Sequence, residues 1–125
     1  MPRPTGFRAT VEARVRHWQE RLRLTDWEIR VVVTSRGIEH AADCEAAPEY
    51  KQATLRFNPK KVPLADLDAF VVHELMHCHV WPLAAAAENL AKGDAVALEF
   101  VREREEGLTT ELERLVLGLV AREDS

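Results

Sequence analysis

The sequence predicts an α+β fold in which one helix, three strands and two further helices follow one another in a single domain, residues 1–125. Three observations predict it. Apolar residues recur at helical spacing near the amino terminus, short strand-like runs occupy positions 27–58, and long helix-forming stretches fill the second half. The composition agrees, because a chain of 125 residues that is 46% hydrophobic and 30% charged can bury one modest core.

The first helix is expected from Thr10 to about Leu24. Its apolar positions are separated by four, three and four residues, a spacing that places them on one helical face. Thr25 and Asp26, which have low helix propensity, end it. The residues of the apolar face are Val11, Val15, Trp18 and Leu22.

Three strands are expected next. Residues 27–34 are rich in β-branched side chains and form the clearest candidate. Residues 42–47 form a weaker one, ended by Pro48, and residues 52–58 a stronger one, ended by Asn58-Pro59. A turn over residues 48–51 would make the last two strands antiparallel neighbours. The expected sheet is therefore three-stranded and mainly antiparallel.

Two long helices should complete the chain. The first covers Leu64 to Val80, with Pro63 suited to the helix start and acidic residues in the first turn, where they complement the helix dipole. It should stop near Trp81, because Pro82 disfavours helix at the residue before it. A short alanine-rich helical turn, residues 83–92, then leads to a last helix from about Asp94 to Ala121.

Residues 73–77 of the first of these helices read His-Glu-Leu-Met-His. Histidines four residues apart lie on the same helical face, so His73 and His77 can reach one metal ion. The glutamate beside the first histidine, Glu74, can then take a proton from a water on that ion. This pattern predicts a zinc site with a built-in general base.

The motif and the order of the elements resemble those of the zincin metallopeptidases. The likeness is greatest to very small gluzincins and to short metallopeptidase-like proteins of bacteria and phages. It covers residues 10–120 in layout, but only the five motif residues in sequence. The resemblance implies a minimal zincin core, one zinc ion per chain and metalloendopeptidase activity. It also implies that a peptide substrate pairs with an edge strand, here expected near Gln52–Asn58.

A third metal ligand is needed, because catalytic zinc usually has three protein ligands. No histidine follows His79, which itself points about 200° away from His77 around the helix. A carboxylate of the last helix, the gluzincin arrangement, is therefore expected. Glu105 is favoured, since it interrupts an apolar stripe; a break near Gly107 would favour Glu99 or Glu106 instead. The stripe consists of Val101, Leu108, Leu112, Leu115 and Leu119.

The chain also departs from the gluzincin pattern. Gluzincins often carry an aspartate four residues after the ligand glutamate, where this chain has Thr109 or Thr110. No tyrosine or histidine follows the motif to stabilise an oxyanion, and Tyr50, His40 or an arginine is left to substitute. A second reading therefore stays open, a catalytically weak or inactive zinc-binding regulatory or interaction domain.

The charge, the hydrophobic runs and the cysteines give expectations about binding partners and cellular location. The net charge is -4, yet residues 1–36 hold eight Lys/Arg against four Asp/Glu. A solvated helix face explains this better than nucleic-acid binding, which is not expected. No apolar run is long enough for a membrane span and the start lacks a signal-peptide core, so a cytoplasmic protein is expected. Cys44 and Cys78 are not spaced as a metal-binding pair, and Cys78 is expected in the core.

Overall fold

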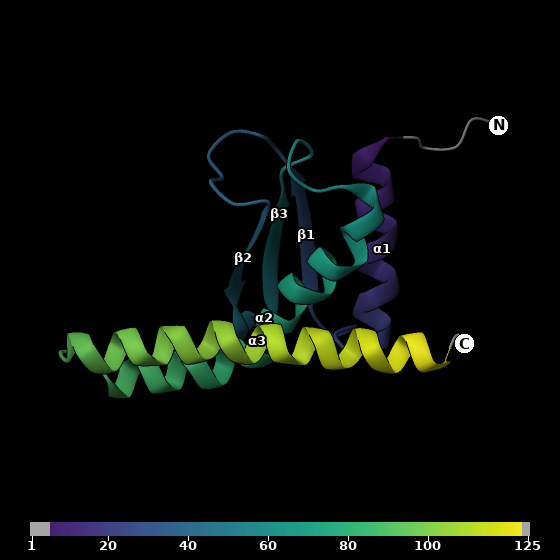
Figure 1. Ribbon diagram of the computed structural model, residues 1–125. Coiled ribbons are helices and arrows are strands. Elements are labelled where there is room, and N and C mark those ends of the chain that lie inside the picture. The colour runs from purple at the N-terminus through teal and green to yellow at the C-terminus, as the bar shows by residue number, and fades with distance from the viewer. Residues whose placement is uncertain (1–5, 124–125) are drawn as a thin grey trace.

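A computed structural model describes residues 6–123 and shows three helices and one three-stranded sheet (Figure 1). The expected α+β class and the order of helix, sheet, helix, helix are confirmed. No helix within the described residues combines the length and apolarity needed to cross a membrane. The elements are α1 (Phe7–Arg21), β1 (Glu28–Val33), β2 (Ala42–Ala47), β3 (Gln52–Phe57), α2 (Leu67–Leu90) and α3 (Ala95–Glu123), with short 3-10 turns at Pro48–Tyr50 and Leu64–Asp66.

The sheet is mixed, with the strand order β1-β3-β2. β3 runs antiparallel to β2, as expected, but parallel to β1. It is the central strand, so the expectation that residues 52–58 form a sheet edge is wrong. The physical reason is burial: Leu55 and Phe57 of β3 are completely buried, and a central position protects them from both sides. The edge strands are β1 and β2.

The core lies between one face of the sheet and helices α1 and α2 (Figure 1). α1 buries the side of the helix that its apolar spacing predicted, through Val11, Val15 and Trp18. Arg30, Thr54 and Arg56 alternate with inward-facing neighbours and are not part of this core. The contributions of α2 to the core include Leu67, Val71, Val72, Leu75, Met76 and Cys78.

The first turn of α2 is anchored to α1 through Asp68. Its carboxylate accepts hydrogen bonds from Arg14 at 2.7 and 3.0 Å and from Trp18 Nε1 at 2.9 Å. Partial burial works against the charged carboxylate, but these donors outweigh it and lower the pKa of Asp68. The contact fixes where α2 begins, and hence where its histidines lie.

The expected helix end at Trp81-Pro82 is wrong. α2 continues through Pro82 to Leu90 and includes most of the segment expected as a separate helical turn. Proline inside a helix removes one backbone hydrogen bond, at a cost of about 3 kcal/mol. Packing of the continued helix against α3 offsets this cost, since the two lie side by side (Figure 1). The last part of α2 and the first part of α3 thereby form a helical arm that extends beyond the sheet (Figure 1).

α3 packs on the body of the protein with only part of the face that the apolar stripe predicted. Leu115 and Leu119 of that stripe are 58% and 50% exposed. Val101, Leu108 and Leu112 of the stripe are less exposed. The other less exposed positions of this helix stretch are 105, 107, 109, 110, 113, 116, 117 and 120, and Thr109 is completely buried. The reason is that α3 packs beside the histidine-bearing side of α2, where glutamate and threonine find partners and leucine would not. This register decides which glutamates reach the histidines.

Candidate metal centre

His73 and His77 lie one turn apart on α2, with ring centroids 5.1 Å apart. Their side chains are mostly buried, 19% and 14% exposed. Both Nε2 atoms face the carboxylate of Glu106 on α3, His73 Nε2 at 2.7 Å and His77 Nε2 at 3.6 Å. One ligand atom from each of the three residues lies within 4.8 Å of the other two. The group can therefore hold one metal ion.

The other nitrogen of each histidine is also held by a carboxylate. His73 Nδ1 lies 2.9 Å from Glu113 Oε1, and His77 Nδ1 lies 2.8 Å from Glu105 Oε1. With its proton on Nδ1, each ring donates to that carboxylate and keeps the Nε2 lone pair free. Carboxylates placed behind ligand histidines in this way fix the tautomer and raise the basicity of the ring. The histidines are thus oriented as a metal site requires.

The three residues fit a transition-metal ion in their donor chemistry. Two imidazole nitrogens and one carboxylate oxygen form a common ligand set of catalytic zinc, with one position left for water. Glu106 is 57% exposed, whereas both histidines are mostly buried. The open side of the group therefore faces solvent on the Glu106 side. Hard cations such as Mg²⁺ and Ca²⁺ prefer oxygen ligands and suit this group less well.

The structure gives Glu105 a different contact from the one that the sequence interpretation expected. Glu105 occupies the inward position expected of it, but contacts His77 at Nδ1, behind the ring. Glu106, one of the two alternatives, joins the histidines instead. It is the next residue along α3, about 100° further around the helix. The other alternative, Glu99, is exposed and does not belong to the group. Residues on the inward face of α3 contact the Nδ1 atoms of the two rings. Glu106, at the edge of that face, contacts their Nε2 atoms.

Glu113 was missed in the sequence interpretation. It lies eight residues after Glu105, so two helical turns bring both residues to the same face of α3. A signal for Glu113 was present in the sequence. Two glutamates on one face of α3 can pair with two histidines on one face of the neighbouring helix α2. Thr109, which stands where gluzincins often carry an aspartate, donates to the Glu105 carbonyl oxygen at 2.8 Å.

Glu74 is buried, with 5% of its surface exposed, yet borders the same hollow as the histidines. Its nearest ionic neighbour is His77 Nε2 at 4.0 Å, and no hydrogen bond to another described residue holds it. Burial raises the pKa of Glu74 to about 7, although the charge of His73 opposes the rise. The carboxyl group is therefore positioned to exchange a proton near neutral pH.

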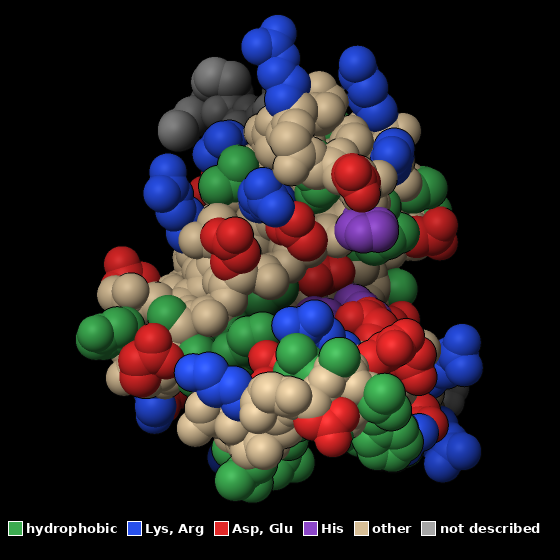
Figure 2. Space-filling model, turned by 90° about the vertical axis from the view of Figure 1, so that its left-hand side faces the viewer, with side chains coloured by type: hydrophobic (Ala, Val, Ile, Leu, Met, Phe, Trp, Pro, Cys, Tyr) green, Lys and Arg blue, Asp and Glu red, His purple; other side chains and the backbone are tan. Residues whose placement is uncertain are grey.

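The hollow measures about 220 Å³ and separates α2 and α3 from strand β2. Asp43, Cys44 and Ala46 of β2 form one wall, and Trp81 lies on the helical side. Figure 2 shows a histidine side chain in the recess between the sheet and the helical arm, with acidic side chains around it. The edge strand beside the candidate centre is thus β2. Within residues 6–123, no strand pairs with its outer side.

The remaining histidine and cysteine positions agree with structural roles. His79 contacts the Leu22 carbonyl oxygen at 2.6 Å and lies outside the metal group, as expected. Cys78 is buried in the core, also as expected, and both cysteines are free thiols. A hydrogen bond with Cys78, together with burial, raises the pKa of Cys44, so the Cys44 thiol is kept neutral.

The centre should make metal-stripped protein less stable as the pH rises. Burial opposes the charged form of His73, but its hydrogen bond to Glu113 and the charges of Glu74 and Glu106 raise its pKa. The pKa of Glu74 is raised from 4.5 to about 7. Both groups bind protons more tightly in the folded state, so their stabilising protonation is lost as the pH passes through these raised values. The shift of Glu74 alone corresponds to an upper value of about 3 kcal/mol.

Urea unfolding at pH 5 and pH 8 with a chelator present checks this prediction. The free energy of unfolding should be higher at pH 5. The difference should shrink in Glu74→Gln, which has no ionisable group there. Greater stability at pH 8 in the parent protein would contradict the assigned protonation states.

Comparison of the chain with known protein families, with curated proteins and with solved structures finds no match.

Proposed function

We propose that this chain is a zinc-dependent metallopeptidase of the gluzincin type, with His73, His77 and Glu106 as zinc ligands. One observation carries the proposal. Both histidine Nε2 atoms and the Glu106 carboxylate converge, each Nδ1 is held by a second carboxylate, and the buried Glu74 opens into the same hollow. The motif alone indicated two ligands and a base. Glu106 adds the third ligand of the group.

The division of chemical roles follows from this placement. A bound zinc ion would supply Lewis-acid chemistry, acidifying a water molecule and polarising the scissile carbonyl group. Glu74 accepts the proton of the attacking water and passes it to the leaving amine. Glu105 and Glu113 hold the histidine rings in the ligating tautomer.

The substrate would be an extended peptide that lies against β2. This strand borders the hollow with residues 43, 44 and 46, and its outer edge is unpaired within the described residues. A peptide added to that edge gains main-chain hydrogen bonds that depend little on its sequence. β2 thereby takes the substrate-binding role that the sequence interpretation gave to residues 52–58.

Zinc-dependent cleavage tests the proposal. Purified protein is incubated with an unfolded protein and a mixture of peptides after removal of metal by a chelator, and again after addition of one equivalent of zinc. Cleavage should be lost in the first sample and restored in the second. Failure to cleave any peptide with zinc bound stoichiometrically would count against a peptidase.

That outcome would favour a second candidate, a zinc-binding domain without turnover. The observation in its favour is the lining of the 220 Å³ hollow. Its described residues include no tyrosine, lysine or arginine that would stabilise an oxyanion. Tyr50 and His40, considered earlier for this role, are exposed and do not border the hollow. Nucleic acid is a poor partner for this site, because its carboxylates would repel phosphate groups.

A further inference from the structure

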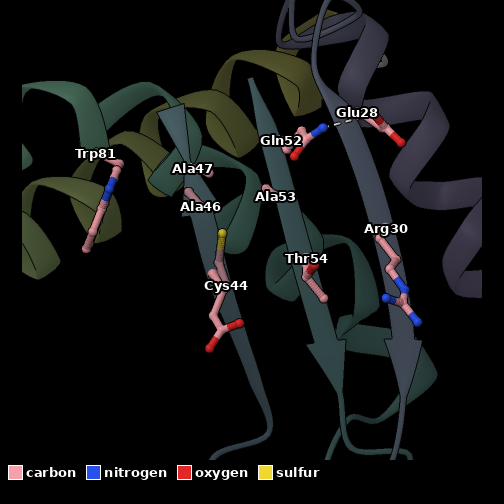
Figure 3. A pocket seen from close by; sticks show the side chains of 10 residues that line it. Glu28, Arg30, Cys44, Ala46, Ala47, Gln52, Ala53, Thr54 and Trp81 are labelled. Atoms are coloured by element: carbon pink, nitrogen blue, oxygen red, sulfur yellow. Dashed lines mark hydrogen bonds between the residues drawn. The ribbon is translucent and has the colours of Figure 1, made fainter. Parts of the chain in front are cut away.

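Trp81 stands at the junction of two hollows. One is the 220 Å³ hollow of the metal group. The other, of about 650 Å³, lies at the end of the sheet where β1 and β3 begin and β2 ends. Figure 3 shows the indole ring on α2 standing apart from β2, across a gap from Ala46 and Ala47. The ring is only half-buried, unlike those of Trp18 and Trp27, which belong to the core. Its exposed surface therefore borders a space beside the β2 edge.

The opposite side of this space carries small side chains. Ala46 and Ala47 of β2 and Ala53 of β3 all border the larger hollow. Ala46 faces the helical side of the sheet, and its small side chain leaves room beside the indole ring. Ala46 and Trp81 border both hollows. A peptide that pairs with β2 and crosses the metal group would therefore also pass Trp81.

The charges that line the two hollows are mostly negative. Glu28 and Glu45 border the larger hollow, and Glu74, Glu105 and Glu106 border the smaller one. Two charges of a zinc ion would offset only part of the second set. Among the described lining residues, Arg30 is the one cation of the larger hollow. Arg56, on the neighbouring strand, is paired with Asp43.

An aromatic face that borders hollows lined by carboxylates suits a cation. Tryptophan is the best aromatic partner for lysine or arginine, whose apolar stems also pack on rings and small side chains. We propose that Trp81, together with Glu45, forms a subsite for a lysine or arginine side chain of a peptide bound along β2. This inference rests on the proposed function for the identity of the bound chain and adds the class of residue that it recognises.

Peptide binding to zinc-loaded Glu74→Gln protein tests the subsite without requiring turnover. The probes are fluorescent peptides of one sequence that carry arginine, lysine, norleucine or phenylalanine at successive positions. At one position, arginine and lysine should bind about two- to thirtyfold more tightly than norleucine. Adding Trp81→Leu should remove that preference, Trp81→Phe should keep part of it, and Glu45→Gln should reduce it. The charge-matched control is Glu20→Gln on α1, which should leave it unchanged.

The outcomes separate this proposal from the peptidase assignment. Equal affinities for arginine and norleucine at every position would overturn the basic subsite, as would tighter binding of phenylalanine or no binding at all. A basic preference that depends on Trp81 would support the subsite even if the parent protein cleaves none of these peptides, in which case the peptidase assignment fails alone. Zinc binding and circular dichroism of the Trp81 variants show whether α2 is intact, and Trp81→Phe provides the decisive comparison if Trp81→Leu does not fold.

Discussion

Replacing Glu106 with alanine is expected to weaken zinc binding by orders of magnitude. Among residues 6–123, Glu106 is the one carboxylate that faces both histidine Nε2 atoms, at 2.7 and 3.6 Å. Its loss removes one of three protein ligands and leaves only the His73–His77 pair. Zinc affinity, measured by competition with a chelating indicator, checks the prediction.

Two variants of the same helix provide the controls. Glu103→Ala removes an exposed carboxylate outside the metal group and should leave zinc affinity unchanged. Glu105→Ala removes the acceptor behind His77 and should weaken binding by about 10- to 100-fold, the usual effect of losing such a partner. If Glu105→Ala abolishes zinc binding while Glu106→Ala retains it, Glu105 is the ligand after all.

Glu74→Gln is expected to lower peptide hydrolysis by about 10²- to 10⁴-fold while zinc stays bound. The amide keeps the shape of the buried side chain, but it cannot accept the proton of the attacking water. The ligand atoms of His73, His77 and Glu106 are left in place. Measurement of kcat/KM alongside zinc content separates loss of the base from loss of the metal.

Glu103→Gln serves as the matched control, since it makes the same amide substitution at an exposed position outside the metal group. It should cleave as the parent does. Unchanged kcat/KM in Glu74→Gln would show that another group accepts the proton. Loss of zinc from that variant would instead place Glu74 among the residues that hold the ion.

The part of the centre that the sequence predicts well is local. His73, Glu74 and His77 lie within two turns of one helix, and helical geometry alone brings the two histidines to one face. The same holds for the apolar face of α1, because a repeat within one helix decides which side is buried. The structure agrees with these expectations, although the chemistry assigned to the motif remains a proposal.

Features that depend on packing between distant segments were predicted less well. β3 is central because it pairs with both β1 and β2. The order of the strands along the chain does not reveal their order in the sheet. Pro82 stays inside α2 because contacts with α3 offset the missing hydrogen bond. The contact of Glu106 with both Nε2 atoms, and of Glu105 with His77 Nδ1, depends on how α3 is rotated against α2. Glu113 reaches His73 only because the two helices pack together over several turns.

The most direct measurement is anomalous diffraction at the zinc absorption edge from a crystal of the zinc-loaded protein. A single peak is expected at about 2.0–2.2 Å from His73 Nε2, His77 Nε2 and a Glu106 carboxylate oxygen. The Nδ1 atoms should remain hydrogen-bonded to Glu113 and Glu105. A peak elsewhere, or one bound through Glu105 in place of Glu106, would contradict the assignment of the metal centre.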